Sequence, residues 1–150
     1  MRLVIQRVSH ANVSVDGKII GHCGRGFCIL AGVKIGDTQA EADWLANKVA
    51  NLRAFEDDEG KMNRSLLDVG GEALVVSQFT LYADARKGRR PAFVEAEAPE
   101  KAEPLVVYFV DRLRAAGVPT QTGIFRAMMQ VEIHNDGPVT IILEREHDEA

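Results

Sequence analysis

The chain has 150 residues, of which 46% are hydrophobic and 27% charged, a balance typical of a globular protein. The length fits a single domain over residues 1–150. No apolar run approaches the ~18 residues of a membrane span, and the N-terminus does not resemble a signal peptide, so we expect a cytoplasmic protein without membrane contacts. The net charge of -4 argues against nonspecific coating of nucleic acid, because such coating neutralises many phosphates.

The first third of the chain predicts strands followed by a helix. Residues 1–8 alternate as a strand does, and Asp16-Gly17 predicts a hairpin turn, since both positions must accept a positive φ. Residues 27–33 form an apolar run that predicts a buried strand. Thr38 and Glu41 have the spacing of a capping box, which predicts that a helix begins there.

The rest of the chain continues with the same two kinds of element. Residues 73–82 predict a strand, and residues from about 100 to 116 predict a second helix with an apolar stripe. The alternating runs 129–134 and 139–143 flank Asn135-Asp136-Gly137-Pro138 and predict a C-terminal hairpin. The predicted fold class is therefore α/β, a single layered domain with mixed or antiparallel β-sheets, barrel-like, and two main helices.

The cysteines and histidines indicate neither a disulfide framework nor a metal site. Cys23 and Cys28 lack C-x-x-C spacing, and the apolar surroundings of Cys28 favour a buried, inert thiol. His22 beside Cys23 would need two further zinc ligands, which the spacing does not supply. We therefore expect no metal and no cofactor.

Residues 86–90 concentrate four cations in five positions of an otherwise acidic chain. Such a run is most often a solvated loop. Alternatively, Lys87, Arg89 and Arg90 form a local patch that binds phosphates at one end of a nucleic acid. The residue types alone leave both interpretations open.

The polar tetrapeptide Ser77-Gln78-Phe79-Thr80 interrupts an apolar predicted strand. In a strand, Gln78, Thr80 and Tyr82 would share one face of the sheet. Hydrogen-bonding side chains in a buried strand need partners. The tetrapeptide is therefore either a strand end that bonds neighbouring backbone or the polar lining of a pocket for a small substrate.

Taken together, these segments resemble the D-aminoacyl-tRNA deacylases from residue 1 to about residue 144. Two signature segments, which are specific when they occur together, carry the resemblance: Ser77-Gln78-x-Thr80 and Asn135-x-Gly137-Pro138-Val139-Thr140. In the family, the stretch before the last strand usually reads Phe-Gly-Ala-Asp-Met or Phe-Ala-Ala-Asp-Met. This chain departs from that pattern at Arg126 and Met128, and its short acidic tail from residue 145 also leaves it.

The resemblance implies a homodimer that hydrolyses the ester at the 3′ end of D-aminoacyl-tRNA. Residues 77–80 would form the catalytic floor of a pocket, which the partner's Gly137 and Pro138, joined by a cis peptide bond, would complete. The terminal adenosine would be held by residues of the pocket wall: Ala102, Phe125, Ala127 and Met129. The tRNA phosphates would be contacted by the basic loop: Lys87, Arg89 and Arg90.

The resemblance also implies a mechanism without a side-chain base, in which the terminal 2′-hydroxyl of the tRNA helps to activate water. Positioning and oxyanion stabilisation would supply the acceleration, because the ester is already activated. Thr80 would position groups, with a role as nucleophile as the competing interpretation. Main-chain carbonyls at Gly137 and Pro138 would exclude an L side chain and admit a D side chain, so glycyl-tRNA should also be accepted.

Two functions of other kinds are the alternatives. A general esterase with Ser77 or Thr80 as nucleophile would cleave small activated esters through an acyl-enzyme. A non-catalytic tRNA-binding module would bind uncharged tRNA with a strong salt dependence. The joint match of both signature segments ranks the deacylase first.

Overall fold

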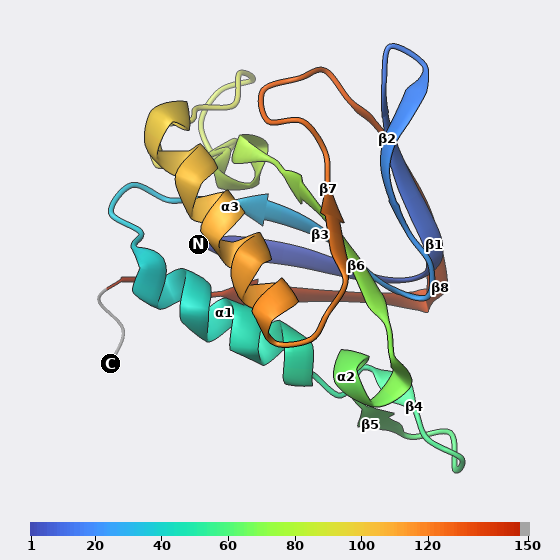
Figure 1. The fold of residues 1–150 in the computed structure, drawn as a ribbon. Helices are drawn as coiled ribbons and strands as arrows, with labels where there is room; N and C mark the ends of the chain where they lie inside the picture. The colour runs from blue at the N-terminus through green and yellow to red at the C-terminus, as the bar shows by residue number, and fades with distance from the viewer. Residues whose placement is uncertain (148–150) are drawn as a thin grey trace.

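Six strands form the main sheet of the computed structural model, which describes residues 1–147 (Figure 1). These strands are β1 (Arg2–Val15), β2 (Lys18–Cys23), β3 (Gly26–Gly32), β6 (Glu72–Ser77), β7 (Thr120–Thr122) and β8 (Gln130–Glu144). Their order is β2-β1-β3-β6-β7, and β8 pairs with β1. β1 is antiparallel to its three neighbours, whereas β3, β6 and β7 run parallel. The sheet is therefore mixed and nearly closes into a barrel, as the sequence predicted.

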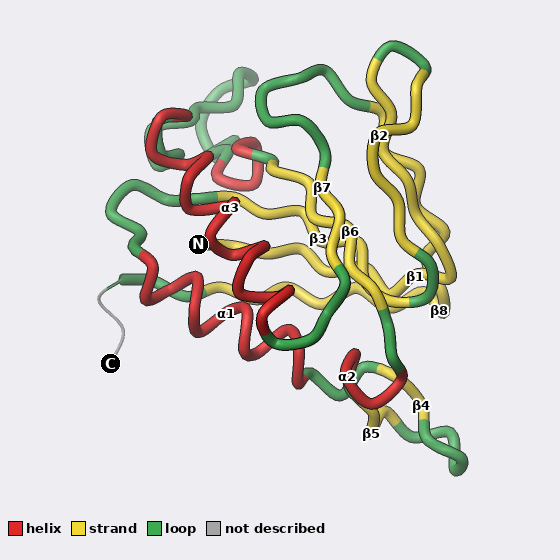
Figure 2. The backbone as a smooth tube through the Cα atoms, viewed as in Figure 1, coloured by secondary structure: helices red, strands yellow, loops and turns green. Residues whose placement is uncertain are grey.

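Two long helices, α1 (Gln39–Asn51) and α3 (Pro99–Ala115), cover one face of this sheet (Figure 2). The shorter elements are α2 (Leu66–Val69), β4 (Phe55–Glu56) and β5 (Met62–Arg64). The apolar sides of both long helices pack on the sheet around Phe27, Phe109 and Leu113, which have no exposed surface. Burial of such side chains is the dominant favourable contribution to folding. None of the helices described is long and apolar enough to cross a membrane.

The local signals at the first turn and the first helix are confirmed. Asp16 and Gly17 have φ values of 51° and 78°, which the predicted hairpin turn requires. At the start of α1, the Thr38 hydroxyl accepts a hydrogen bond from the amide of Ala40 at 3.3 Å. The Glu41 carboxylate in turn accepts one from the Thr38 amide at 3.3 Å, which completes the capping box.

The predicted strand over residues 73–82 is wrong in its second half. β6 ends at Ser77, and a 3₁₀ turn, η1 (Phe79–Tyr82), replaces the remainder. The amide of Gln78 makes the last bond to β3, donating to the Ala31 carbonyl at 2.8 Å, because β3 itself ends one residue later. The side chains therefore do not alternate: Thr80 is exposed, whereas Tyr82 is buried.

The predicted C-terminal hairpin is also wrong. β8 continues through both apolar runs and pairs with β1 along nearly its whole length, from Arg2↔Glu144 to Ser14↔Gln130. Register shifts near Val8 leave residues 136–139 as an irregularity within the ladder, between the pairs Val8↔Asn135 and Gln6↔Thr140. The 14 residues of β1 offer a partner to both runs, so the chain has no need to reverse.

Both cysteines are buried and free, and the predicted burial of Cys28 is thereby confirmed. Burial raises the pKa of the Cys23 thiol to about 11 and that of Cys28 to about 12. Because the thiolate is the reactive form, neither thiol is activated as a nucleophile at neutral pH.

Candidate active site

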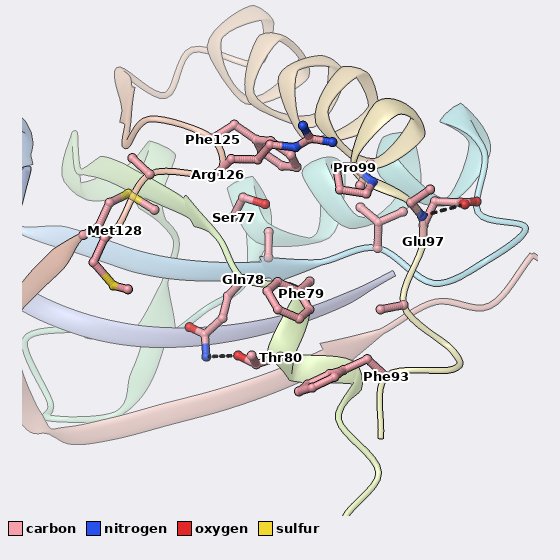
Figure 3. A pocket seen from close by; sticks show the side chains of 17 residues that line it. Ser77, Gln78, Phe79, Thr80, Phe93, Glu97, Pro99, Phe125, Arg126 and Met128 are labelled. Carbon is pink, nitrogen blue, oxygen red and sulfur yellow. Dashed lines mark hydrogen bonds between the residues drawn. The ribbon is translucent and has the colours of Figure 1, made fainter. Parts of the chain in front are cut away.

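A pocket of about 800 Å³ opens at the carboxyl ends of the parallel strands β3 and β6 (Figure 3). This end of parallel strands is a common ligand position in α/β folds. The 3₁₀ turn η1, the N-terminal end of α3 and the loop between β7 and β8 supply the other walls. Eight residues predicted for the catalytic floor and the adenosine site line this one pocket: Ser77, Gln78, Phe79, Thr80, Ala102, Phe125, Ala127 and Met129.

The floor of the pocket carries three hydrogen-bonding side chains. The Gln78 amide donates to the Thr80 hydroxyl, with 3.0 Å between Nε2 and Oγ1. Within residues 1–147, the Ser77 hydroxyl makes no hydrogen bond, so it is free to bind a ligand atom. This floor offers several donors to an oxygen that becomes negatively charged during ester hydrolysis.

The described lining offers these hydroxyls no activating base. It contains no histidine, lysine or cysteine, and its one carboxylate belongs to Glu97. Both oxygens of Glu97 already accept hydrogen bonds, from the amides of Ala98 at 2.9 Å and Gly36 at 3.4 Å. A serine or threonine nucleophile needs an adjacent base, and a metal needs several ligands, so this lining favours neither.

The rest of the lining is largely apolar and includes residues that the sequence analysis missed. Phe93 packs edge-on against Phe79, with ring centroids 5.1 Å apart. Phe93, Ala96 and Glu97 lie on an irregular segment that is tied to the fold by the isolated bridges Lys34↔Ala96 and Asp84↔Ala92. No periodic pattern marks such a segment.

The two positions that depart from the family pattern lie at the pocket rim. Arg126, with a φ of 68°, makes an ion pair of 2.8 Å with Glu100 in the first turn of α3. The pKa of Glu100 is lowered, first by a backbone hydrogen bond at this helix start and then by Arg126. Met128 is 91% exposed. Arg126 therefore fastens the loop after β7 to α3.

Gly137 and Pro138 do not meet residues 77–80 within the described chain. They are exposed on β8, are joined by a cis peptide bond and do not line the pocket. The buried Arg7 braces this segment by donating to the carbonyl of Asp136 at 3.1 Å and to that of Ala54 at 2.8 Å. Arg7 also makes an ion pair of 3.0 Å with Glu56.

Lys87, Arg89 and Arg90 lie on the exposed loop between β6 and α3, outside the pocket. Within residues 1–147 they make no ion pair. Their neighbour Arg86 does, at 2.8 Å from Asp84, and its hydrogen bond lowers the pKa of Asp84 to about 2. The loop thus presents three cationic side chains to solvent.

Comparison with known proteins matches residues 4–144 to the family described as D-Tyr-tRNA(Tyr) deacylase. A D-aminoacyl-tRNA deacylase of Thermomicrobium roseum is 62% identical over 96% of this chain and 94% of that protein. One of Roseiflexus castenholzii is 64% identical over 96% of this chain and 92% of that protein. The solved structure of a c-Myc DNA unwinding element binding protein has a TM-score of 0.92 at 45% identity, covering 97% of this chain and 99% of the other.

The fold has a hydrogen-bonding pocket at the ends of its parallel strands, and deacylases match nearly the whole length of the chain. These findings together place the chain among the hydrolases. The chain belongs to the D-aminoacyl-tRNA deacylase family. A probable eukaryotic D-amino acid tRNA deacylase, 17% identical, shares the fold with a TM-score of 0.80, over 95% of this chain and 97% of the other.

Proposed function

We propose that this protein hydrolyses the ester that joins a D-amino acid to the terminal ribose of tRNA, releasing the free amino acid and the tRNA. The observation that carries the proposal is the single pocket in which the strand end at residues 77–80 faces Ala102 and Phe125. The names of the relatives, D-aminoacyl-tRNA deacylases at 62% and 64% identity, support the same substrate.

Hydrolysis in this pocket proceeds by attack of water on the ester carbonyl. The polar floor binds the developing oxyanion, for which Ser77 and the Gln78–Thr80 pair are within reach of a bound ester. Because the lining offers no base, the 2′-hydroxyl next to the scissile ester assists removal of the proton from water. Thr80 positions groups and forms no covalent intermediate.

The working unit is a homodimer in which each pocket is completed by the other subunit. β8 pairs with β1 alone among the described strands, so one edge of its 15 residues stays open to a second chain. Gly137 and Pro138 lie on this strand, exposed and away from the pocket of their own chain. In the dimer, a second copy brings its Gly137 and Pro138 to this pocket, so that residues 77–80 and residues 137–138 act in the same active site.

The Gly137 and Pro138 carbonyls then select the stereochemistry of the substrate. They occupy the space that an L side chain would need, whereas a D side chain points away from them. Glycine has no side chain to exclude, so glycyl-tRNA is hydrolysed as well. Lys87, Arg89 and Arg90 bind tRNA phosphates, which makes substrate binding weaken as salt concentration rises.

The decisive experiment compares hydrolysis of D-Tyr-tRNA and L-Tyr-tRNA by the purified protein, with Thr80→Ala in parallel. We expect rapid loss of the D ester while the L ester is spared. Equal cleavage of both esters would instead indicate a general esterase. If both survived while uncharged tRNA bound in a salt-dependent way, the chain would be a nucleic-acid-binding module.

A further inference from the structure

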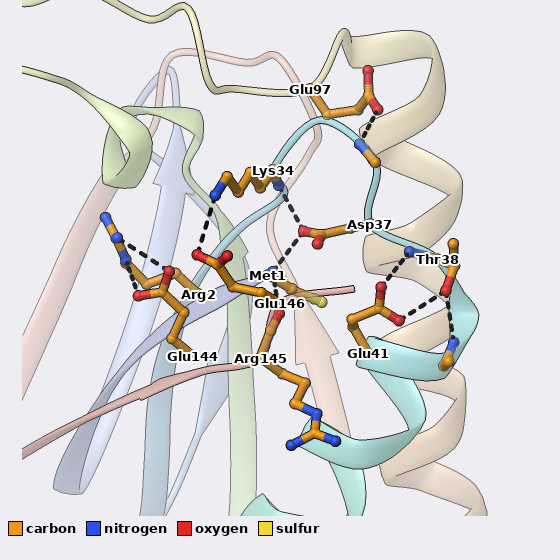
Figure 4. Close-up of polar contacts among 12 residues, drawn as sticks. Met1, Arg2, Lys34, Asp37, Thr38, Glu41, Glu97, Glu144, Arg145 and Glu146 are labelled. Atoms are coloured by element: carbon orange, nitrogen blue, oxygen red, sulfur yellow. Dashed lines mark hydrogen bonds and ion pairs between the residues drawn. The ribbon is translucent and has the colours of Figure 1, made fainter. Parts of the chain in front are cut away.

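A charged cluster forms where the N-terminus, the loop before α1 and the chain after β8 meet (Figure 4). Its carboxylates are those of Asp37, Glu41, Glu97, Glu144 and Glu146. Its cationic groups are the Met1 amino group and the side chains of Arg2, Lys34 and Arg145.

Asp37 is the most enclosed of these carboxylates, with a side-chain exposure of 0%. Its Oδ2 atom accepts hydrogen bonds from the Met1 amino group at 2.6 Å and from the Lys34 amide at 2.7 Å. Its Oδ1 atom is buried and has no hydrogen-bond partner among residues 1–147. Buried carboxylate oxygens normally have a partner, so Oδ1 has the capacity to bind a further donor or a cation.

Two other side chains bring metal-binding atoms to Asp37. Glu41 and His147 each offer one, and the three ligand atoms lie within 4.8 Å of one another. The Glu41 oxygens also accept hydrogen bonds from the Thr38 amide and hydroxyl, and each keeps a lone pair for a metal ion. In a tetrahedral zinc site, bonds of about 2.0–2.1 Å hold the ligand atoms about 3.3 Å apart. The described atoms therefore need to approach by at most about 1.5 Å. His147 is exposed, so its side chain can make this movement.

The position of the His147 imidazole depends on a glycine. At Gly36, an added Cβ atom would lie 3.0 Å from Cε1 and 3.2 Å from Nδ1 of His147. A φ of +95° also favours glycine at this position. Gly36 thus leaves room for an imidazole directly beside Asp37, its neighbour in the chain.

We propose that Asp37, Glu41 and His147 bind a Zn²⁺ ion, with water completing the coordination. One imidazole and two carboxylates are ligands that Zn²⁺ accepts. The ion joins the chain after β8 to the start of α1, so its binding stabilises the folded protein. None of the three residues lines the pocket at residues 77–80, so this site does not depend on the deacylase proposal.

The test uses the full chain, freed of metal with EDTA and titrated with ZnCl2 in a calorimeter. We expect one Zn²⁺ per chain and a Tm that rises with zinc concentration. His147→Ala should weaken binding by about tenfold or more and remove the rise in Tm. Because His147 is exposed, this variant should keep the wild-type Tm in the absence of zinc. Co²⁺ bound in place of zinc should give the intense visible absorption of a tetrahedral site.

The matched control is His10→Ala. His10 stacks on His134, with ring centroids 3.7 Å apart, and this exposed pair is the other place where a surface histidine site could form. The fluorescence of Trp44, the only tryptophan, reports whether the chain after β8 still packs on α1, since the Arg145 guanidinium lies 4.7 Å from the centre of its ring. The proposal is overturned if the wild-type protein shows no zinc binding, or if His10→Ala loses the binding and His147→Ala retains it.

Discussion

The two signature segments differ in whether they line the pocket and in how many hydrogen bonds hold them. Residues 77–80 line a pocket, yet the one side-chain hydrogen bond among them, within the described chain, joins Gln78 to Thr80. Residues 135–140 line no part of that pocket, yet Arg7, Asn135 and Thr140 hold them through several hydrogen bonds. The proposed binding of substrate needs free polar groups on the floor, whereas the proposed exclusion of one stereoisomer needs a segment that is held in place. The pocket and the hydrogen-bonded segment are thus two separate parts of the chain.

The largest loss of hydrolysis rate is expected from Gly137→Ala, which disturbs the backbone of residues 135–140. At a φ of +132°, an added Cβ atom would lie 2.9 Å from Cγ2 of Val139 and 3.1 Å from its backbone nitrogen. The segment must shift, and a displacement of about 1 Å near the reacting groups costs on the order of 100-fold in rate. Hydrolysis of D-Tyr-tRNA under single-turnover conditions measures the loss. Gly60→Ala is the matched control, because Gly60 also has a positive φ but no atom within 4 Å.

Mixing two inactive variants tests whether the proposed homodimer shares each active site between its two subunits. Thr80→Trp blocks the pocket from an exposed position, while Gly137→Ala damages only the β8 segment. In a mixed dimer, one site combines an intact pocket with the partner's intact β8 segment. An equal mixture should therefore regain roughly a quarter of the wild-type rate. Activity that stays at the level of the separate variants would contradict a shared site.

Arg7→Met should have the next largest effect, because it removes the hydrogen bonds that Arg7 donates to the Asp136 and Ala54 carbonyls, while residues 135–140 themselves are unchanged. Its loss leaves the Ala54 and Asp136 carbonyls without their donor, which costs about 1–3 kcal/mol of unfolding free energy. Urea unfolding measures this cost. Arg2→Met is a suitable comparison, since Arg2 is only partly buried and bonds Glu144 and the Leu81 carbonyl outside the 135–140 segment. An Arg7→Met protein with unchanged stability and unchanged D/L discrimination would show that the segment is rigid without Arg7.

Thr80→Ala tests the floor and should cost on the order of tenfold in rate, the equivalent of one hydrogen bond. Thr80→Ser should restore most of the rate, because it keeps the hydroxyl that Gln78 donates to. Both are measured on D-Tyr-tRNA. A trapped acyl-enzyme, or a loss of several thousandfold, would establish Thr80 as the nucleophile and reject the positioning role.

Arg126→Ala should have the smallest effect on stability, because its ion pair with Glu100 is exposed. Since Arg126 lowers the pKa of Glu100, its removal should raise that pKa toward the ordinary value of a glutamate. An NMR titration of the Glu100 carboxyl carbon detects the change. An unchanged pKa would mean that the backbone hydrogen bond alone sets it.

The sequence predicted elements well wherever the deciding interactions are local. The capping box at Thr38 and the turn at Asp16 depend on neighbours within four positions, and both are confirmed. The C-terminal hairpin failed because the true partner of β8 is β1, at the other end of the chain. Residues 73–82 failed as a strand because β3 ends at Gly32, a limit set by tertiary structure.

In the candidate active site, too, features set by the local sequence were predicted and features set by tertiary structure were not. Its polar floor was recognised from the residue types and the family pattern, and the structure gathers those residues in one pocket. Phe93 and Glu97 were missed because isolated bridges, and no periodic element, place them there. The proposed zinc ligands escaped notice for a related reason, since Glu41 and His147 come together only through the fold.

The pairing of β1 with β8 also bears on how the protein is made. β1 leaves the ribosome before its partner, because 114 residues separate the end of β1 at Val15 from the start of β8 at Gln130. At a synthesis rate of about 5–20 residues per second, β1 waits roughly ten seconds for β8. During that interval β2 and β3 can pair with β1, but the edge that β8 later covers stays open to other nascent chains. The sheet is thus completed only once β8 has been synthesised, and chains truncated before β8 should be prone to aggregate.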